Sequence, residues 1–135
     1  MKKYLLLSVF FSSGAFAITP NSGIPDISQK VPAYMAQDIV NAYEENTISA
    51  DRRFKGKMFV VAGKIMNIAT DLSDEAYVTL TSKNSWYSPR LYFSESEMDK
   101  LANLKIGQDL VSICLGDGST MKSPRMKECS IVNFK

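Results

Sequence analysis

Histidine is absent from this chain of 135 residues, which contains only two cysteines and one tryptophan. Without histidine the chain can form no Ser-His or Cys-His nucleophile pair, and it lacks a common zinc ligand. The sequence also contains no phosphate-binding glycine loop and no nucleophile-elbow motif. We therefore expect no catalytic residues, no bound metal ion and no cofactor.

Long apolar runs are missing too. The run Leu5–Phe11 is far shorter than the roughly 20 residues that a membrane-spanning helix needs. Lys2 and Lys3 precede it and Ala15-Phe16-Ala17 follows it, which is the pattern of a secretory signal peptide. No cysteine follows these small residues, so we expect no lipid anchor. Residues 1–17 are thus predicted to be a cleaved signal peptide of a periplasmic protein; the alternative is an N-terminal core helix.

Neither sign of charge is in surplus once the predicted signal peptide is removed. The chain has 16 basic and 14 acidic residues, and Lys2 and Lys3 are the only charged residues among the first seventeen, which leaves fourteen of each sign. Nucleic-acid-binding domains usually carry a basic excess, because contacts with phosphate supply much of their affinity. The composition therefore argues against nucleic acid as the partner.

The two cysteines, Cys114 and Cys129, have one possible pairing. They lie in strand-like segments, 109–115 and 128–134, on either side of a Gly/Asp/Ser/Pro-rich stretch that predicts a loop with Asp117-Gly118 at its tight turn. Residues that face each other across a hairpin have Cα atoms about 4.5 to 5.5 Å apart, which suits a disulfide. In an exported protein we expect that disulfide; two buried free thiols are the alternative.

The hydrophobic pattern predicts a helix, three strands, a short helix and two strands. In chain order we expect a flexible leader over 18–31, a helix over 32–46, a further turn over 49–54 capped by Ser49, strands over 58–68, 76–81 and 90–93, a short helix with Ser94 and Glu97 as its capping box, and strands over 109–115 and 128–134. This order is that of an OB-fold. We therefore predict a mainly β protein in which residues 32–135 form a five-stranded antiparallel OB-fold barrel, with an N-terminal helix and a short helix between strands 3 and 4.

Alternation and spacing place particular side chains within these elements. The N-terminal helix should bury Met35, Ile39 and Tyr43, and Gly63 should mark a bend in the first strand. The second and third strands should bury Ala76, Val78, Leu80, Leu91 and Phe93 and expose Tyr77, Thr79, Thr81, Arg90 and Tyr92.

Several segments also resemble a known family. Asp38–Asn46, Ala50–Lys57 and Val61–Ile65 are similar to the helix-into-first-strand signature of the tRNA_anti-like family of bacterial OB-fold proteins. Later segments resemble that family's remaining strands: Tyr77–Leu80, Leu104–Gln108 and Glu128–Val132. The resemblance implies the fold and supplies no catalytic residues, since many members look like exported proteins or lipoproteins of unassigned function.

A group of aromatic residues beside an arginine is the candidate binding site. By alternation Tyr77, Arg90 and Tyr92 project from the outer face of the second and third strands, which OB barrels commonly use for binding. Trp86 and Tyr87 lie in the loop between these strands. Such rings can stack on a nucleobase or sugar, or anchor a protein. The alternative is packing, with the loop rings over a barrel end and the two strand tyrosines as a cross-strand pair.

Two other clusters have simpler explanations. The acidic turn Asp71–Glu75 could bind a hard cation, but calcium normally takes six or more oxygen ligands, and a solvated turn explains the acidic residues. The basic run Arg52–Lys57 could contact phosphate, but we prefer a solvated surface as its explanation.

The sequence thus predicts an exported, non-catalytic module that binds a protein or a small ligand in the periplasm. The alternative function is binding of single-stranded nucleic acid or an oligosaccharide on the barrel face. An enzyme is the third class, for which the sequence offers only scattered carboxylates and serines.

Overall fold

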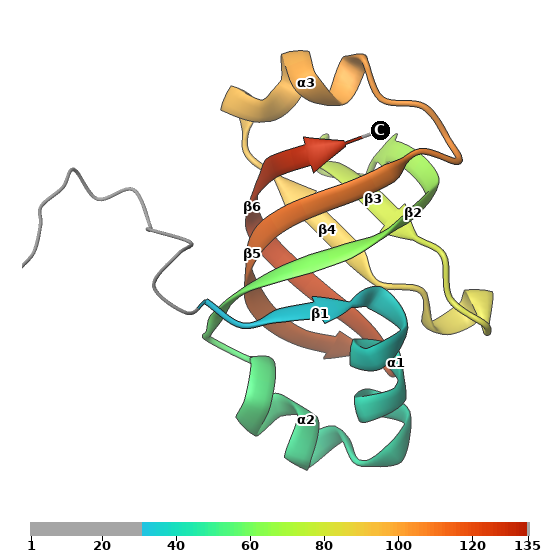
Figure 1. Ribbon diagram of the computed structural model, residues 1–135, viewed down its shortest axis with the longest axis vertical. Coiled ribbons are helices and arrows are strands. Elements are labelled where there is room, and N and C mark those ends of the chain that lie inside the picture. The colour runs from blue at the N-terminus through green and yellow to red at the C-terminus, as the bar shows by residue number, and fades with distance from the viewer. Residues whose placement is uncertain (1–30, 135) are drawn as a thin grey trace, which may run out of the picture. The chain divides into compact units, whose positions relative to one another are not determined.

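The computed structural model of the protein describes residues 31–134 (Figure 1). The predicted signal peptide and all but the last residue of the predicted leader lie outside this range. The elements are β1 (Ala33–Met35), α1 (Ala36–Glu45), α2 (Thr47–Phe54), β2 (Met58–Thr70), β3 (Ala76–Leu80), the 3-10 helix η2 (Ser85–Tyr87), β4 (Arg90–Phe93), the 3-10 helix η3 (Glu95–Glu97), α3 (Met98–Ala102), β5 (Asp109–Thr120) and β6 (Ser123–Phe134). Within residues 31–134 every helix is too short or too polar to span a membrane.

Strands β2 to β6 close into the predicted five-stranded OB-fold barrel. β2 closes it by pairing with β5 over Met58–Lys64 and with β3 over Ile65–Thr70. The barrel is mixed rather than antiparallel, because β4 and β6 run parallel while the other four pairings between these strands are antiparallel. Figure 1 shows α1 and α2 at one end of the barrel and α3 at the other, so the outer faces of several strands remain free of helices.

Gly63 lies where β2 changes its partner strand. A Cβ atom at this position would lie 3.1 Å from the Cβ of Ala36 and 3.2 Å from Cδ1 of Leu80. The glycine therefore lets the first residue of α1 approach the strand closely. The irregularity in strand pairing comes slightly later, between Ile65 and Asn67.

The N-terminal helix begins later than the predicted position at residue 32. Ala33–Met35 instead form β1, which pairs in parallel with Val60–Ala62 of β2. Met35 is consequently exposed, contrary to the prediction, whereas Ile39 and Tyr43 are buried as expected. A local apolar pattern could not reveal a strand whose pairing partner lies far along the chain.

Asn46 ends α1, as predicted, and also caps α2. Its side-chain Oδ1 accepts a hydrogen bond from the backbone N–H of Ser49 at 3.0 Å. The second helix therefore begins at Thr47, and the prediction that Ser49 is its cap is wrong. The hydroxyl of Tyr43 donates to Oδ1 of Asp51 at 2.8 Å and joins the two helices. Burial, followed by this bond to a carboxylate, raises the pKa of Tyr43 well above its usual value.

We expect Tyr43→Phe to lower the free energy of unfolding by about 1 kcal/mol, because the ring stays buried and only the hydrogen bond is lost. Urea unfolding measures this change. Asp51→Ala removes the same bond from the other side, so the double variant should be less destabilised than the sum of the two single variants. Strict additivity would contradict the assigned bond.

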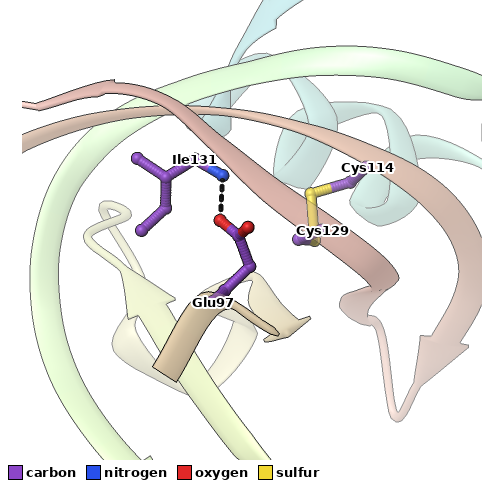
Figure 2. The surroundings of a disulfide bond; sticks show 4 residues. All are labelled: Glu97, Cys114, Cys129 and Ile131. Carbon is purple, nitrogen blue, oxygen red and sulfur yellow. Dashed lines mark hydrogen bonds between the residues drawn. A yellow bond between two sulfur atoms is a disulfide. The ribbon is translucent and has the colours of Figure 1, made fainter. Parts of the chain in front are cut away.

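The predicted capping box before α3 is not formed. Oγ of Ser94 lies 2.9 Å from Oγ of Ser96, and no side chain caps the helix start. The carboxylate of Glu97 turns inward instead, where Oε1 accepts a hydrogen bond from the N–H of Ile131 at 2.8 Å. Figure 2 shows this bond close to the disulfide. The buried Glu97 thus fastens the segment before α3 to β6.

The disulfide between Cys114 and Cys129 is present as predicted, with both cysteines buried and their Cα atoms 4.2 Å apart. The hairpin that contains it is longer than predicted, because the Gly/Asp/Ser/Pro-rich stretch continues both strands. The chain turns at Met121 and Lys122, whose φ angles are 50° and 68°, and not at Asp117-Gly118. Three register shifts between β5 and β6 accommodate the irregular residues.

Candidate functional site

The candidate site is the outer face of β3, β4 and β6. Strand pairing sets Tyr77 opposite Tyr92 and Thr79 opposite Arg90, and it sets Arg90 beside Arg125 of β6. Paired residues in neighbouring strands project to the same side of a sheet. The five side chains therefore share one face.

The two tyrosines form a cross-strand pair, with ring centroids 5.4 Å apart. Cζ of Arg90 lies 5.1 Å from the ring centroid of Tyr77, and Cζ of Arg125 lies 4.6 Å from that of Tyr92. Nη1 of Arg125 also donates to the hydroxyl of Tyr92 at 3.4 Å. Tyr92 is only 7% exposed, and Thr79 is buried as well, so the prediction that alternation exposes them is wrong. Alternation sets the face of a side chain but not whether its neighbours cover it.

Trp86, by contrast, is 85% exposed. It lies on η2, where the Oδ1 of Asn84 accepts a hydrogen bond from its backbone N–H at 3.0 Å. The segment between β3 and β4 that contains η2 is also joined to β6 near its end, because the hydroxyl of Ser123 donates to the carbonyl of Ser88 at 2.7 Å. The backbone is thus held while the indole stays free to contact a ligand.

A hollow of about 460 Å³ lies between Trp86 and the tip of the β5–β6 hairpin. Its described lining consists of Trp86, Tyr87, Arg90, Thr120, Met121, Ser123 and Arg125. None of these residues carries a carboxylate, two carry a guanidinium group, and the side chain of Met121 is 89% exposed. This basic hollow can therefore accept an anion that has a flat or apolar group beside it.

A second hollow of about 410 Å³ shares Arg125 with the first. It is lined by Glu75, Tyr92, Phe93, Ser94, Asp117, Arg125, Lys127 and Glu128. Within it the carboxylate of Asp117 lies 3.8 Å from Nε of Arg125 and 3.7 Å from Nζ of Lys127. Glu75 and Glu128 are exposed. Three carboxylates face two cations, so this acidic hollow has the opposite polarity to the basic one.

The structure brings four of the five predicted site residues into these hollows. Trp86, Tyr87 and Arg90 line the basic hollow, and Tyr92 lines the acidic one. Tyr77 lies under Arg90 and lines neither. The prediction missed Arg125 and Met121, because the Gly, Asp, Ser and Pro residues of their segment predict a loop. Alternation along a strand through residues 123–127 places Arg125 on the outer face.

Internal hydrogen bonds stabilise both the acidic turn Asp71–Glu75 and the basic run Arg52–Lys57. Oδ1 of Asp71 accepts hydrogen bonds from the N–H groups of Ser73 at 2.8 Å and Glu75 at 3.0 Å, which closes the acidic turn. In the basic run, Nζ of Lys57 donates to the carbonyl of Arg52 at 2.8 Å. No group of three or more potential metal-ligating side chains occurs in the described part of the chain.

Comparison with known proteins identifies relatives of the fold. The tRNA_anti-like family model matches residues 2–130. The crystal structure of a Klebsiella pneumoniae lipoprotein, described as a candidate nucleic acid-binding protein, aligns with a TM-score of 0.66 at 16% identity over 85% of this chain and 100% of that one. OBody AM2EP06, in complex with hen egg-white lysozyme, aligns with a TM-score of 0.51 at 14% identity over 87% of this chain and 98% of its own. None of the curated proteins that were compared matches the chain.

Proposed function

Since the chain belongs to the tRNA_anti-like family, we propose that it is an exported, non-catalytic OB-fold module that holds a protein or a small ligand on the outer face of β3, β4 and β6. The observation that carries this proposal is Trp86, an indole 85% exposed in a hollow that also contains Arg90 and Arg125. Tryptophan and arginine are the residue types that most often dominate the energy of an interface.

Three observations support export. The segment 1–17 has the pattern of a signal peptide, and Cys114 and Cys129 form a disulfide, which persists in oxidising compartments. The Klebsiella pneumoniae protein of similar fold is described as a lipoprotein. In this proposal cleavage after Ala17 releases a mature chain with a leader up to residue 31 and the barrel domain after it.

The chemistry of the two hollows supports binding rather than catalysis. Their lining supplies guanidinium groups, an indole, hydroxyls and carboxylates, and the chain has no histidine to serve as a general base near neutral pH. Asp117 already faces Arg125 and Lys127. These groups are suited to holding and orienting a ligand.

Single-stranded nucleic acid is the second candidate ligand, favoured by Arg90 and Arg125 beside the exposed Trp86. Two features oppose it. A guanidinium group already lies over each of the two tyrosine rings, which reduces their use as stacking platforms. The carboxylates of the acidic hollow would also repel phosphates.

We expect Trp86→Ala to reduce the amount of partner retained from an envelope extract of the native host about tenfold, which corresponds to a loss of about 1.4 kcal/mol in binding. The melting temperature should not change, because the indole is exposed. Ile106→Ala is the matched control: this side chain is 67% exposed and lines neither hollow. Mass spectrometry of the material that each variant retains measures the amount of bound partner. If Trp86→Ala retains every partner that the wild-type protein retains, the proposed face is not the binding face.

A further inference from the structure

We propose that the ligand of this face is an extended peptide segment that carries a carboxylate at one point and an amino or guanidinium group three or four residues away. This inference rests on the proposed function and specifies the ligand's chemistry. It follows from the opposite polarity of the two hollows, from the distance between them and from the exposed apolar side chains at one of them.

The polarity of the face is set by which charges line each hollow. Arg90 and Arg125 line the basic hollow, and none of its described lining residues carries a carboxylate, although Asp117 of the neighbouring hollow lies 3.8 Å from Nε of Arg125. At the other end, Glu75 and Glu128 add to the carboxylate of Asp117. Because Arg125 lines both hollows, the two adjoin and a single ligand can contact both. Such a ligand should be negative where it meets the basic hollow and positive where it meets the acidic one.

Strand geometry gives the distance between the two charges. β4 and β6 run parallel with Arg90 beside Arg125, so both strands lead from the basic end of the face to the acidic end. Phe93 pairs with Cys129, so Glu128 lies near Phe93, which at about 3.3 Å per residue is about 10 Å along β4 from Arg90. An extended peptide covers this distance in about three or four residues.

This distance and the change of sign exclude other simple ligands. A free amino acid carries its two charges on either side of one carbon atom and cannot span from Arg90 to Glu128. A polynucleotide carries one sign of charge along its whole length and would place phosphates against Glu75 and Glu128. A peptide with separated charges fits both constraints.

The exposed apolar side chains indicate what accompanies the ligand's carboxylate. Trp86 and Met121 line the basic hollow and are 85% and 89% exposed. An indole offers a flat apolar surface, and a methionine side chain adapts its shape to a neighbouring group. The residue next to the ligand's carboxylate should therefore be aromatic or aliphatic.

The test uses the full mature protein and the fluorescence of Trp86, which is the only tryptophan in the chain. The first probe is a capped peptide with phenylalanine beside a glutamate and a lysine four positions beyond the glutamate. The second has glutamate in place of that lysine, and the third is an oligothymidine. At low salt the wild-type protein should bind the glutamate–lysine peptide about tenfold more tightly than the glutamate–glutamate peptide, and more tightly than the oligothymidine.

Glu75→Lys should reverse the order of the two peptides, because it replaces a carboxylate of the acidic hollow with an ammonium group. Asp99→Lys is the matched control, since it makes the same change of charge at an exposed position on α3 that lines neither hollow. The control should keep the wild-type order. A reversal confined to Glu75→Lys supports the proposal.

The inference is overturned if the wild-type protein binds the two peptides equally, prefers the oligothymidine, or binds no peptide up to about 1 mM, a concentration that corresponds to only about −4.1 kcal/mol. It is also overturned if both lysine variants change the order alike. In each of these cases a loss of native partner in Trp86→Ala would still support the proposed function. Retention of every partner in Trp86→Ala would instead remove the proposed function and this inference together.

Discussion

Replacing Cys114 and Cys129 together by alanine should lower the free energy of unfolding by about 3 kcal/mol. The disulfide joins residues 15 positions apart, and the chain-entropy model assigns about 3 kcal/mol to a closed loop of that length. A domain of this size is stable by only about 5 to 15 kcal/mol, so the loss is a large part of the total. Both cysteines are buried, and the smaller alanine side chains add a packing loss.

Without the disulfide, the second half of β6 should be destabilised first. Glu128, next to Cys129, has a φ angle of 51° in the left-handed region, and the register between β5 and β6 shifts between Ile113 and Leu115, opposite this point. The disulfide holds that bulge together. Ile131, whose N–H donates to the buried carboxylate of Glu97, lies two residues after Cys129. Without the disulfide the amide of Ile131 should exchange its hydrogen faster than amides of β3.

Urea unfolding of the double-alanine variant and of the wild-type protein under reducing conditions measures this effect. The reduced wild-type protein should unfold close to the variant, because both lack the same bond. Tyr43→Phe serves as a comparison, since it removes a single hydrogen bond between α1 and α2 and should cost only about 1 kcal/mol. If the double-alanine variant unfolds at the urea concentration of the oxidised wild-type protein, the bond does not stabilise the fold.

Much of the barrel could be predicted because its signals are local. β3 and β4 alternate in a short, uninterrupted pattern, and their predicted bounds of 76–81 and 90–93 agree with Ala76–Leu80 and Arg90–Phe93. The disulfide followed from an even cysteine count in two strand-like segments. Each of these conclusions needs only the residues within or beside one element.

The errors arose where distant contacts decide the structure. β1 exists because Ala33–Met35 pair with Val60–Ala62, and no property of the shorter segment signals that pairing. The hairpin turns at Met121 and Lys122, which are not typical turn residues, whereas Gly118 occupies an irregular position within β5. The typical turn residues of that stretch therefore predicted the wrong turn.

The candidate site could likewise be predicted where its signals are local and not where they depend on distant contacts. The tyrosines and Arg90 were placed on the correct face because strand alternation is local. Arg125 was missed because it reaches that face only through the parallel pairing of β4 with β6. The polarity of the face is likewise a property of four separate segments, since Glu75, Arg90, Asp117 and Glu128 come together only in the closed barrel.

Gly116→Ala should destabilise the protein by about 3 kcal/mol or more, although it adds a single methyl group. A Cβ atom at Gly116 would overlap the carbonyl oxygen of Phe54 and lie 2.6 Å from its carbonyl carbon. These are backbone atoms at the end of α2, and they cannot move away freely. The N–H of Gly56 donates to the carbonyl of Gly116, and the N–H of Gly116 donates to the carbonyl of Lys57, both at 2.9 Å.

Gly63→Ala is the matched control for this substitution. Its added methyl group would meet the side chains of Ala36 and Leu80 at 3.1 and 3.2 Å, and side-chain atoms can shift by a few tenths of an ångström. Urea unfolding should therefore show a clearly smaller loss for Gly63→Ala than for Gly116→Ala. Equal losses of stability would mean that the backbone between α2 and β2 can shift as easily as a side chain does.

The same substitution should also weaken binding, because Gly116 directly precedes Asp117 in β5. Asp117 lies 3.8 Å from Nε of Arg125 and 3.7 Å from Nζ of Lys127, so a displaced β5 backbone would shift the carboxylate that positions both cations. At a temperature where Gly116→Ala remains folded, partner retention should fall although no residue of the hollows has changed. Gly63→Ala, whose added methyl group would meet the buried side chains of Ala36 and Leu80, should retain the partner fully. Because both variants are compared while folded, reduced retention by Gly116→Ala alone indicates a change at the face itself.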